Sequence, residues 1–350
     1  MVLLTINAGS SSLKFATFRL SDLACELRGQ LSGIGQGQVN FSGVDWPTDS
    51  LKLENHRDAV ALLIARLEID AVGHRVVHGG TRFTAPVRIY AATIAALRDL
   101  IPLAPLHQPH NVSAIEAIAA ALPNTPQVAC FDTAFHATQP EVATRFALPE
   151  KYWAKGIRRY GFHGLSYEAI LHQLGGDIPK RLIIAHLGNG ASLAAVKDGR
   201  CIATTMGFST LDGLVMGTRA GLLDPGVILH LMRSESLDLG ALEKLLYHES
   251  GLLGLSGKTA DMKTLLDASD SASLLAVETY CHRIIREIGS LAAALEGVDA
   301  LIFTGGIGEN AGPVRAQVTE KLNWLGAIDV RVIPTDEELT IARHCRRLLS

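Results

Sequence analysis

I-N-A-G-S-S-S-L-K, residues 6–14, is the stretch of sequence that decides the fold. An apolar, β-rich run at 2–6 leads into it, and a second apolar run at 13–18 leads out, so one glycine and three serines form the turn between two strands. Turns of this kind present backbone N–H groups at close range and form anion-binding concavities, and Lys14 adds a positive charge. An ordinary hairpin with a polar loop is an equally good interpretation of these residues alone.

The same pattern returns about half a chain length later. Residues 181–185 are again strand-like, residues 186–192 read H-L-G-N-G-A-S, and residues 193–196 are apolar, so that Ser12 aligns with Ser192. A second equivalence is predicted between the apolar runs 127–131 and 299–303, because each ends in small polar residues. An internal repeat of this length predicts two duplicated α/β domains, whose phosphate loops face each other across a cleft.

Composition narrows the class of protein. The chain has 350 residues, of which 48% are hydrophobic and 19% charged, and its net charge is −3. Two domains with cores of their own are therefore expected. A nucleic-acid or membrane partner is not expected, because proteins that bind either usually carry an excess of basic residues. The five cysteines are scattered without C-x-x-C, which indicates a reducing compartment. No signal peptide and no apolar run of about 18 residues is visible, so we expect a cytoplasmic protein.

Several charged or polar side chains occupy positions that suit a catalytic or ligand-binding role. Arg75 lies in an apolar run, where arginine is rare unless it is paired; it forms either a structural ion pair or a fork onto a carboxylate or phosphate. Asp132 follows the strand 127–131, where open α/β sheets bind ligands, although it could equally cap a turn. Arg219 lies among small residues, and His163 stands near two glycines, where a structural histidine is the commoner explanation. Two arginines from separate segments suit a carboxylate and a transferring phosphoryl group.

Other segments give more limited predictions. Residues 20–55 are expected to form short strands and loops, and residues 272–295 one long amphipathic helix. Asn111 is expected to cap a helix over 112–122, and Thr335 to cap the last helix in a capping box with Glu338, which leaves Glu337 available to Mg²⁺. The glycine-rich segment 305–310, expected to be a loop, lacks G-x-G-x-x-G, and the chain has no G-x-x-x-x-G-K-[ST], so neither a dinucleotide fold nor a P-loop is predicted.

Taken together, these segments resemble the acetate kinase (acetokinase) family, part of the acetate and sugar kinase/actin superfamily. The motifs that carry the resemblance are I-N-A-G-S-S-S-L-K at 6–14, G-H-R-V-V-H-G-G at 73–80, P-L-A-P-L-H at 102–107, F-D-T-A-F-H at 131–136, Y-G-F-H-G at 160–164, H-L-G-N-G-A-S at 186–192, M-G-T-R at 216–219, G-G-I-G-E-N at 305–310 and I-P-T-D-E-E-L at 333–339. They run in family order across nearly the whole chain.

The resemblance implies a fold and a reaction. The fold is two duplicated ribonuclease-H-like domains with an active-site cleft between them, divided here as 1–134 plus 338–350 and 135–337. The reaction is reversible, Mg²⁺-dependent, direct in-line transfer of the ATP γ-phosphoryl group to acetate, which gives acetyl phosphate and ADP. Mn²⁺ is an alternative ion, and a homodimer is expected.

It also implies roles for individual residues. Asp132, His163 and Arg219 are the catalytic candidates, with Asp132 orienting the metal or an arginine and the other two stabilising the phosphoryl group. Arg75 is expected to contact the substrate carboxylate, and Asn7 and Glu337 to hold the metal. The acyl pocket is expected to contain Val77, Leu106, Phe162 and Thr210. The ATP-binding candidates are Ser12, Lys14, His186, Leu187, Gly188, Asn189, Gly190, Asp261, Met262, Lys263, Gly306, Ile307, Gly308, Glu309 and Asn310.

The chain departs from the family pattern in places. It is shorter between 30 and 70 and between 322 and 332, and Lys263 stands where arginine is common. Thr210 replaces a proline that usually lines the acyl pocket. A propionate or other short-chain acyl kinase is therefore an alternative. A nucleotide-binding switch of the same fold without kinase activity is a further one, which Arg75 and Arg219 argue against.

Overall fold

The computed structural model describes residues 1–37, 39–46 and 52–350. Residues 38 and 47–51, which belong to the predicted segment of short strands and loops, lie outside the described residues. The chain forms two compact units, one of Met1–Phe135, Gly164–Ala169 and Asp336–Ser350, the other of His136–His163 and Ile170–Thr335. The domain boundaries proposed from the sequence stay a prediction. Within the described ranges, none of the helices combines the length and the apolar character that crossing a membrane requires.

The first unit is built on a mixed seven-stranded sheet with the order β4-β3-β2-β1-β5-β7-β6. β1 pairs with β2 in antiparallel and with β5 in parallel, and β5 pairs in parallel with β7. The strands are β1 (Val2–Ala8), β2 (Ser12–Arg19), β3 (Cys25–Ser32), β4 (Asn40–Ser42), β5 (Ala71–Val76), β6 (Val87–Arg88) and β7 (Gln127–Phe131).

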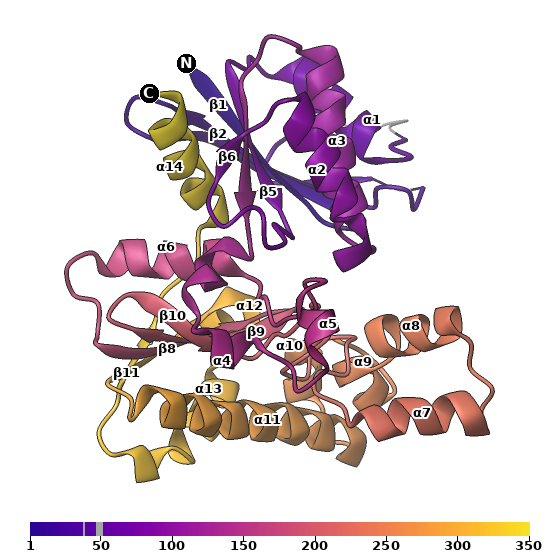
Figure 1. Ribbon diagram of the computed structural model, residues 1–350, viewed down its shortest axis with the longest axis vertical. Helices are drawn as coiled ribbons and strands as arrows, with labels where there is room; N and C mark the ends of the chain where they lie inside the picture. Colours follow the sequence, from indigo (N-terminus) through magenta and orange to yellow (C-terminus); the bar gives the residue numbers. More distant parts are fainter. Residues whose placement is uncertain (38, 47–51) are drawn as a thin grey trace. The chain divides into compact units, whose positions relative to one another are not determined.

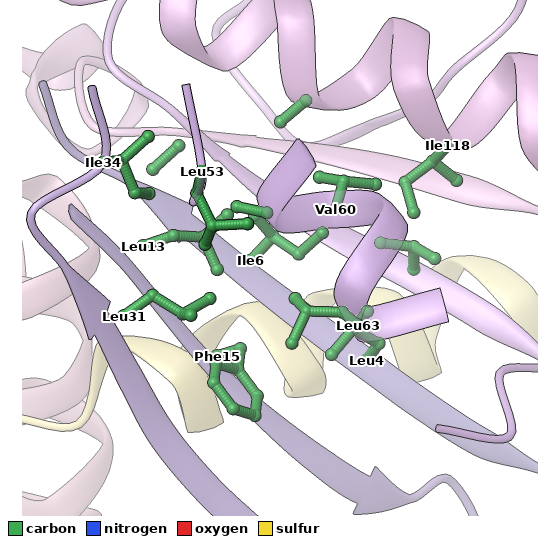
Figure 2. Packing of buried hydrophobic residues seen from close by; sticks show 14 of the residues in the cluster. Leu4, Ile6, Leu13, Phe15, Leu31, Ile34, Leu53, Val60, Leu63 and Ile118 are labelled. Atoms are coloured by element: carbon green, nitrogen blue, oxygen red, sulfur yellow. The ribbon is translucent and has the colours of Figure 1, made fainter. Parts of the chain in front are cut away.

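Helices cover both faces of this sheet (Figure 1). On one face lie α1 (His56–Arg66), α2 (Ala91–Asp99), the short 3-10 helix η1 (Ile101–Leu103) and α3 (Gln108–Ala121), and on the other lies α14 (Glu337–Leu349). Side chains alternate along a strand, so Leu4 and Ile6 of β1 pack against Val60 and Leu63 of α1, as Figure 2 shows. Leu3 points the other way, into the cluster that contains Ile341 of α14. Each such buried side chain contributes roughly 1.5–3 kcal/mol.

The second unit contains a five-stranded sheet with the order β10-β9-β8-β11-β12. Its strands are β8 (Arg181–Leu187), β9 (Ala191–Lys197), β10 (Arg200–Thr204), β11 (Ala300–Thr304) and β12 (Asp329–Val332). The long helix predicted at 272–295 is confirmed as α11 (Ser271–Leu295), which packs on β8, β9 and β10. The other elements are α4 (Glu141–Thr144), α5 (Glu150–Trp153), α7 (Pro225–Ser234), α8 (Leu239–His248), α9 (Gly251–Ser256), α10 (Met262–Asp267), α12 (Gly305–Asn310), α13 (Gly312–Glu320) and η3 (Asn323–Leu325), while η2 (Ala134–Thr138) and α6 (Gly164–Leu174) are divided between the units.

The two sheets share one topology, as the internal repeat predicted. The order β3-β2-β1-β5-β7 corresponds to β10-β9-β8-β11-β12, and the equivalence of β1–β2 with β8–β9 is confirmed. The second equivalence, of 127–131 with 299–303, is wrong. β11 lies beside β8 as β5 lies beside β1, so the counterpart of β11 is β5 rather than β7. Both candidate runs are apolar strands that end in small residues, and local sequence does not encode which neighbour a strand pairs with.

Three helix boundaries differ from those predicted. α3 begins at Gln108 with a proline in its first turn, so Asn111 lies inside the helix and does not cap it. α14 is capped by Asp336, whose side chain accepts a hydrogen bond from the Leu339 N–H at 2.9 Å, so the box of Thr335 and Glu338 is wrong. Aspartate is the better N-cap acceptor. The expected loop at 305–310 is the short helix α12, which Gly305 enters at a φ of 79°.

Candidate functional site

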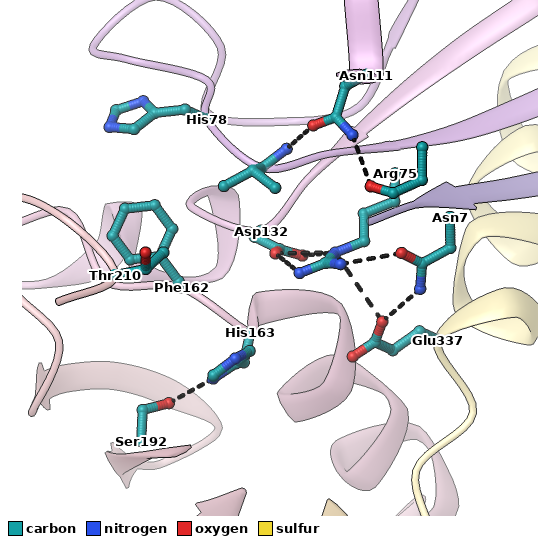
Figure 3. Close-up of polar contacts among 12 residues, drawn as sticks. Asn7, Arg75, His78, Asn111, Asp132, Phe162, His163, Ser192, Thr210 and Glu337 are labelled. Atoms are coloured by element: carbon teal, nitrogen blue, oxygen red, sulfur yellow. Dashed lines mark hydrogen bonds and ion pairs between the residues drawn. The ribbon is translucent and has the colours of Figure 1, made fainter. Parts of the chain in front are cut away.

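Charged and amide side chains of the first unit meet where β1, β5 and β7 end and α14 begins (Figure 3). The Nε of Arg75 donates to both carboxylate oxygens of Asp132 at 3.1 and 3.0 Å, and its Nη2 donates to Oδ2 at 2.6 Å. Its Nη1 donates to Asn7 Oδ1 at 2.9 Å, and Asn7 Nδ2 donates to Glu337 Oε2 at 2.9 Å. The structure thus brings four of the predicted site residues together.

Burial governs the charges of this cluster. The Asp132 side chain has no exposed surface and that of Arg75 is 19% exposed. Burial lowers the pKa of Arg75, but Asp132, Glu337 and Glu338 together raise it more, so the guanidinium stays charged. Burial raises the pKa of Asp132 to about 6, against the opposing effect of Arg75. At neutral pH the carboxylate is therefore mostly ionised, and the pair is ionic.

Two residues whose role here the sequence did not reveal fix the turn between β1 and β2, residues 9–11, which is called the anion turn below because it is the predicted anion-binding turn. Asn111 accepts from the Val77 N–H at 3.0 Å and donates to the Ala8 carbonyl at 3.1 Å, which ties the end of β5 to the end of β1. The buried His56 has its Nε2 2.7 Å from the Gly9 carbonyl. Because all three hydrogen bonds go to backbone groups far away in sequence, neither residue carries a local signal of this role.

The turn itself is compact and open to solvent. The Gly9 N–H donates to the Ser12 carbonyl at 2.8 Å, which closes the turn. The predicted phosphate contacts Ser12 and Lys14 are half-buried and exposed respectively. Both are therefore accessible to an anion, as the sequence pattern suggested.

Rings and a guanidinium of the second unit gather around the loop after β8. The imidazole of His163 stacks on that of His186, with ring centroids 4.3 Å apart, and its Nδ1 lies 2.8 Å from Ser192 Oγ. A Cβ added at Gly190 would lie 3.2 Å from His163 Nε2 and 3.7 Å from Arg219 Nη1. Glycine at this position is what lets the loop backbone approach both catalytic candidates.

A cavity of about 660 Å³ in the second unit is large enough for a nucleoside and adjoins this loop. Eight of the predicted ATP-binding residues line it, and they are Gly188, Asn189, Asp261, Met262, Lys263, Gly306, Ile307 and Asn310. Five lining residues were not predicted, and they are Ala260, Leu266, Asp267, Ala311 and Pro313. Leu266 and Asp267 lie one helical turn beyond Met262 and Lys263, and that spacing could have revealed them.

The carboxylates of two predicted ATP-binding residues, Asp261 and Glu309, accept hydrogen bonds from backbone N–H groups. The Asp261 carboxylate caps α10, accepting from the N–H of Thr264 at 2.8 Å and from its hydroxyl at 2.7 Å. Glu309 does not line the cavity, and its carboxylate accepts from the backbone N–H groups of Gly305 and Thr335. His186, Leu187, Gly190 and Gly308 are likewise absent from the lining. Their assignment to ATP stays a prediction.

The acyl pocket also stays a prediction. Val77 and Leu106 belong to the first unit, whereas Phe162 and Thr210 belong to the second. Val77, Phe162 and Thr210 are buried and Leu106 is half-buried. The Thr210 carbonyl accepts a hydrogen bond from Arg219 Nη1 at 3.0 Å, which joins this position to a catalytic candidate.

The predicted metal positions offer oxygen ligands of the right kind. Across the described ranges, no group of three or more His, Cys, Asp or Glu side chains is arranged to hold a metal ion. Mg²⁺, however, is commonly bound by one or two carboxylates together with substrate phosphates and water. Glu337 Oε2 accepts from Asn7 Nδ2, while Asn7 Oδ1 accepts from Arg75 Nη1 and keeps a second lone pair. The Glu337 carboxylate and the Asn7 amide oxygen therefore fit that requirement.

Comparison with known proteins gives one consistent result. The model of the acetokinase family matches residues 2–339. The acetate kinase of Rhodopseudomonas palustris is 49% identical over 392 aligned positions, covering 99% of this chain and 98% of the relative. Since this chain has 350 residues, at least 42 aligned positions (392 less 350) have no residue here, in agreement with a shortened chain.

Solved structures agree with the family model. The structure of Porphyromonas gingivalis acetate kinase superposes with a TM-score of 0.90 at 36% identity and covers 100% of both chains. That of a propionate kinase from Francisella tularensis gives 0.93 at 35% identity and covers 99% of both chains. The predicted fold class, two duplicated α/β domains of the acetate and sugar kinase type, is confirmed.

The buried pair of Arg75 and Asp132 should be costly to break. Asp132→Asn leaves the guanidinium without its anionic partner, and we expect the free energy of unfolding to fall by about 2–4 kcal/mol. Asp299→Asn is the matched control, because the Arg181–Asp299 pair is 37% and 35% exposed and should be worth less than about 1 kcal/mol. Urea denaturation of both variants measures the difference; equal, small losses would contradict the role assigned to burial.

Proposed function

This chain belongs to the acetokinase family, and we propose that it transfers the γ-phosphoryl group of ATP to acetate, reversibly giving acetyl phosphate and ADP. The observation that carries the proposal is the fork of Arg75 beside Asn7, Asp132 and Glu337. It combines a fixed cation for a carboxylate with oxygen ligands for a metal ion. Phosphoryl transfer requires mainly such positioning and charge neutralisation.

Arg75 is suited to receive the acceptor carboxylate. A guanidinium has five N–H donors. Asp132 takes the Nε hydrogen and one on Nη2, and Asn7 takes one on Nη1. One hydrogen on each terminal nitrogen has no partner among the described residues, and a carboxylate binds such a pair in parallel. Acetate is ionised at neutral pH, as carboxylates are, so no general base is needed. Asp132 therefore serves to hold Arg75.

Residues of the second unit are suited to the phosphoryl group and the nucleoside. Arg219 supplies a second cation and His163 a ring nitrogen, both close to Gly190 in the loop after β8. The cavity lined by Asn189, Met262, Lys263 and Ile307 is the proposed nucleoside site. Arg219 and His163 would then stabilise the charge on the phosphoryl group during in-line transfer.

We assign Asn7 and Glu337 to Mg²⁺, with Mn²⁺ as an alternative ion. When bound, the ion would neutralise the negative charge of the phosphate groups. Asn7 and Glu337 would orient it through their oxygen atoms, while Arg75 Nε, 4.0 Å from Glu337 Oε2, balances the carboxylate charge.

Neighbouring glutamates provide the test of the metal assignment. Glu337→Ala should raise the Mg²⁺ concentration for half-maximal rate by about tenfold or more. Glu338 instead lies 3.5 Å from Arg28 Nη1, so Glu338→Ala should leave the Mg²⁺ requirement within twofold and lower stability by about 1 kcal/mol or less. Mg²⁺ titrations of both variants test the assignment. It would be refuted if Glu338→Ala raised the Mg²⁺ requirement and Glu337→Ala lowered only the stability.

A short-chain acyl kinase of broader range is the second candidate. A propionate kinase is among the structures that superpose on this chain, and Thr210 stands where the resemblance leads us to expect a proline, so a rotatable side chain with a hydroxyl takes the place of a rigid ring. One extra methylene in an apolar pocket changes binding by only about 1–3 kcal/mol. Acetate is therefore proposed as the best of several substrates.

A hydroxamate assay for acyl phosphate over a carboxylate series tests both the reaction and its range. We expect acetate to be best and propionate to be within about tenfold in kcat/KM. Thr210→Pro should sharpen the preference for acetate because a rigid ring cannot rotate away from a longer acyl chain, whereas Thr210→Val, a matched shape, should leave the ratio unchanged. A chain that binds ATP without forming any acyl phosphate would be a nucleotide-binding switch, and the proposal would fail.

A homodimer is proposed through the second unit. Large apolar side chains are exposed on α7, α8, α9 and α11, among them Val227, Leu229, Met232, Leu239, Leu255, Leu274 and Leu275. We propose that they form one patch, because a contiguous exposed apolar patch marks an association surface.

Sedimentation equilibrium at micromolar concentration should give twice the chain mass. Leu229→Glu should produce monomers, because it buries a charge in the proposed interface. Val142→Glu, at a valine that is 86% exposed on α4, should leave the dimer intact. A monomeric wild-type chain, or a Leu229→Glu variant that still dimerises, would argue against this surface.

A further inference from the structure

His163 is held in a backbone conformation that costs free energy. Its φ is 61°, in the left-handed region, directly before the first residue of α6. For residues other than glycine this region is sparsely populated and persists only where surrounding contacts enforce it. The ring of His163 contacts His186 and Ser192, and these contacts act on the side chain. On the backbone, the Gly164 N–H donates to the Asp132 carbonyl at 3.0 Å, which restrains the residue after His163 and leaves the question of what restrains the residues before it.

His136 supplies a restraint on the preceding residue. It is buried in the second unit, and its Nε2 lies 2.8 Å from the Phe162 carbonyl oxygen. A carbonyl oxygen can only accept, so Nε2 carries the hydrogen and Nδ1 is left with a lone pair. Cys201 Sγ lies 3.2 Å from that Nδ1 and 3.6 Å from the Ala203 carbonyl oxygen. The lone pair on Nδ1 is the nearer of the two acceptors, so we assign the S–H to Nδ1, where it favours the Nε2–H tautomer.

The backbone before His163 is also in steric contact with this ring. Gly161 has a φ of 82°, and a Cβ at that position would lie 2.6 Å from His136 Cγ and 2.7 Å from Thr204 Cγ2. Gly161 is thus held by close packing against His136 and Thr204, and Phe162 by a hydrogen bond from His136. Burial lowers the pKa of His136 to about 4, so its ring is neutral at physiological pH and the tautomer is constant.

We propose that His136 is a positioning residue for His163: the Cys201 thiol fixes its tautomer, its Nε2–H holds the Phe162 carbonyl, and the left-handed conformation of His163 is thereby maintained. The inference rests on the proposed function, in which His163 stabilises the transferring phosphoryl group. It gives a role to the histidine of F-D-T-A-F-H and to a buried cysteine, neither of which belongs to the substrate-contacting set.

Two substitutions of His136 distinguish the roles of its two ring nitrogens. The amide nitrogen of His136→Gln reaches about as far as Nε2 and can still donate to Phe162, whereas that of His136→Asn reaches only about as far as Nδ1. We expect His136→Asn to lower kcat by about 10²-fold, because misplacement by about 1 Å has effects of this size, with KM for ATP and acetate changed less than about threefold. His136→Gln should retain kcat within about fivefold.

Cysteine variants test the tautomer. Cys201→Ala should lower kcat by about three- to tenfold, because it leaves Nδ1 without its donor and weakens the Nε2–H tautomer. Cys281→Ala removes the same atom from another buried site of the second unit, and it should leave kcat unchanged. Equal kcat values for the two variants would overturn the proposed role of the thiol.

A second readout does not depend on catalysis. The ring of His163 stacks on His186, so its Cε1–H resonance, identified with His163→Gln, reports the stack through ring-current shielding. The resonance should shift in His136→Asn and stay in place in His136→Gln and Cys281→Ala.

An unmoved signal in folded His136→Asn overturns the inference even in a chain that phosphorylates acetate. Conversely, a wild-type chain that forms no acyl phosphate overturns the proposed function, and the resonance still decides this inference. Should His136→Asn not fold, Cys201→Ala decides, and an unmoved resonance with kcat within twofold overturns the proposal.

Discussion

The buried ion pair of Arg75 and Asp132 is the constraint from which the arrangement of the first unit follows. A guanidinium and a carboxylate removed from water must satisfy each other, and three short hydrogen bonds do so here. The parallel pairing of β5 with β7 brings the two residues within reach of each other. Arg75 faces Cys130 in the register, so the chain must run two residues further before Asp132 can reach it. The parallel pairing in turn requires a crossover connection, which α2 and α3 provide.

Duplication gives the two units one topology and leaves their chemistry different. β1 ends in a turn next to charged side chains, with Asn7 and Arg75 in contact. β8, its counterpart, ends in a glycine-rich loop surrounded by His163, His186 and Arg219. A strand end in an α/β sheet supplies a position for a ligand but does not specify which groups meet it. The same topology can therefore hold oxygen ligands in one copy and a nucleoside-sized cavity in the other.

Several polar side chains in this molecule act on the backbone. Asn111 and His56 hold the ends of the anion turn, Glu309 accepts from two backbone N–H groups, and His136 holds the Phe162 carbonyl. Buried backbone groups must be paired, and glycine-rich loops offer few internal partners. A residue predicted to bind ATP, such as Glu309, can therefore also fix a loop.

The sequence by itself determined the fold class, the repeat of β1–β2 as β8–β9, the long helix α11 and the family, because each is encoded in local patterns or in motifs of fixed order. It also named Asn7, Arg75, Asp132 and Glu337 before their contacts were known. Only the tertiary structure decided that β11 corresponds to β5, that Asp336 rather than Thr335 caps α14, and that Asn111 bridges two strands. Strand neighbours and side-chain partners are chosen by packing between residues far apart in sequence, and a local pattern holds no information about them. The grouping of Ala311 and Pro313 with the loop after β8 in one cavity is of the same kind.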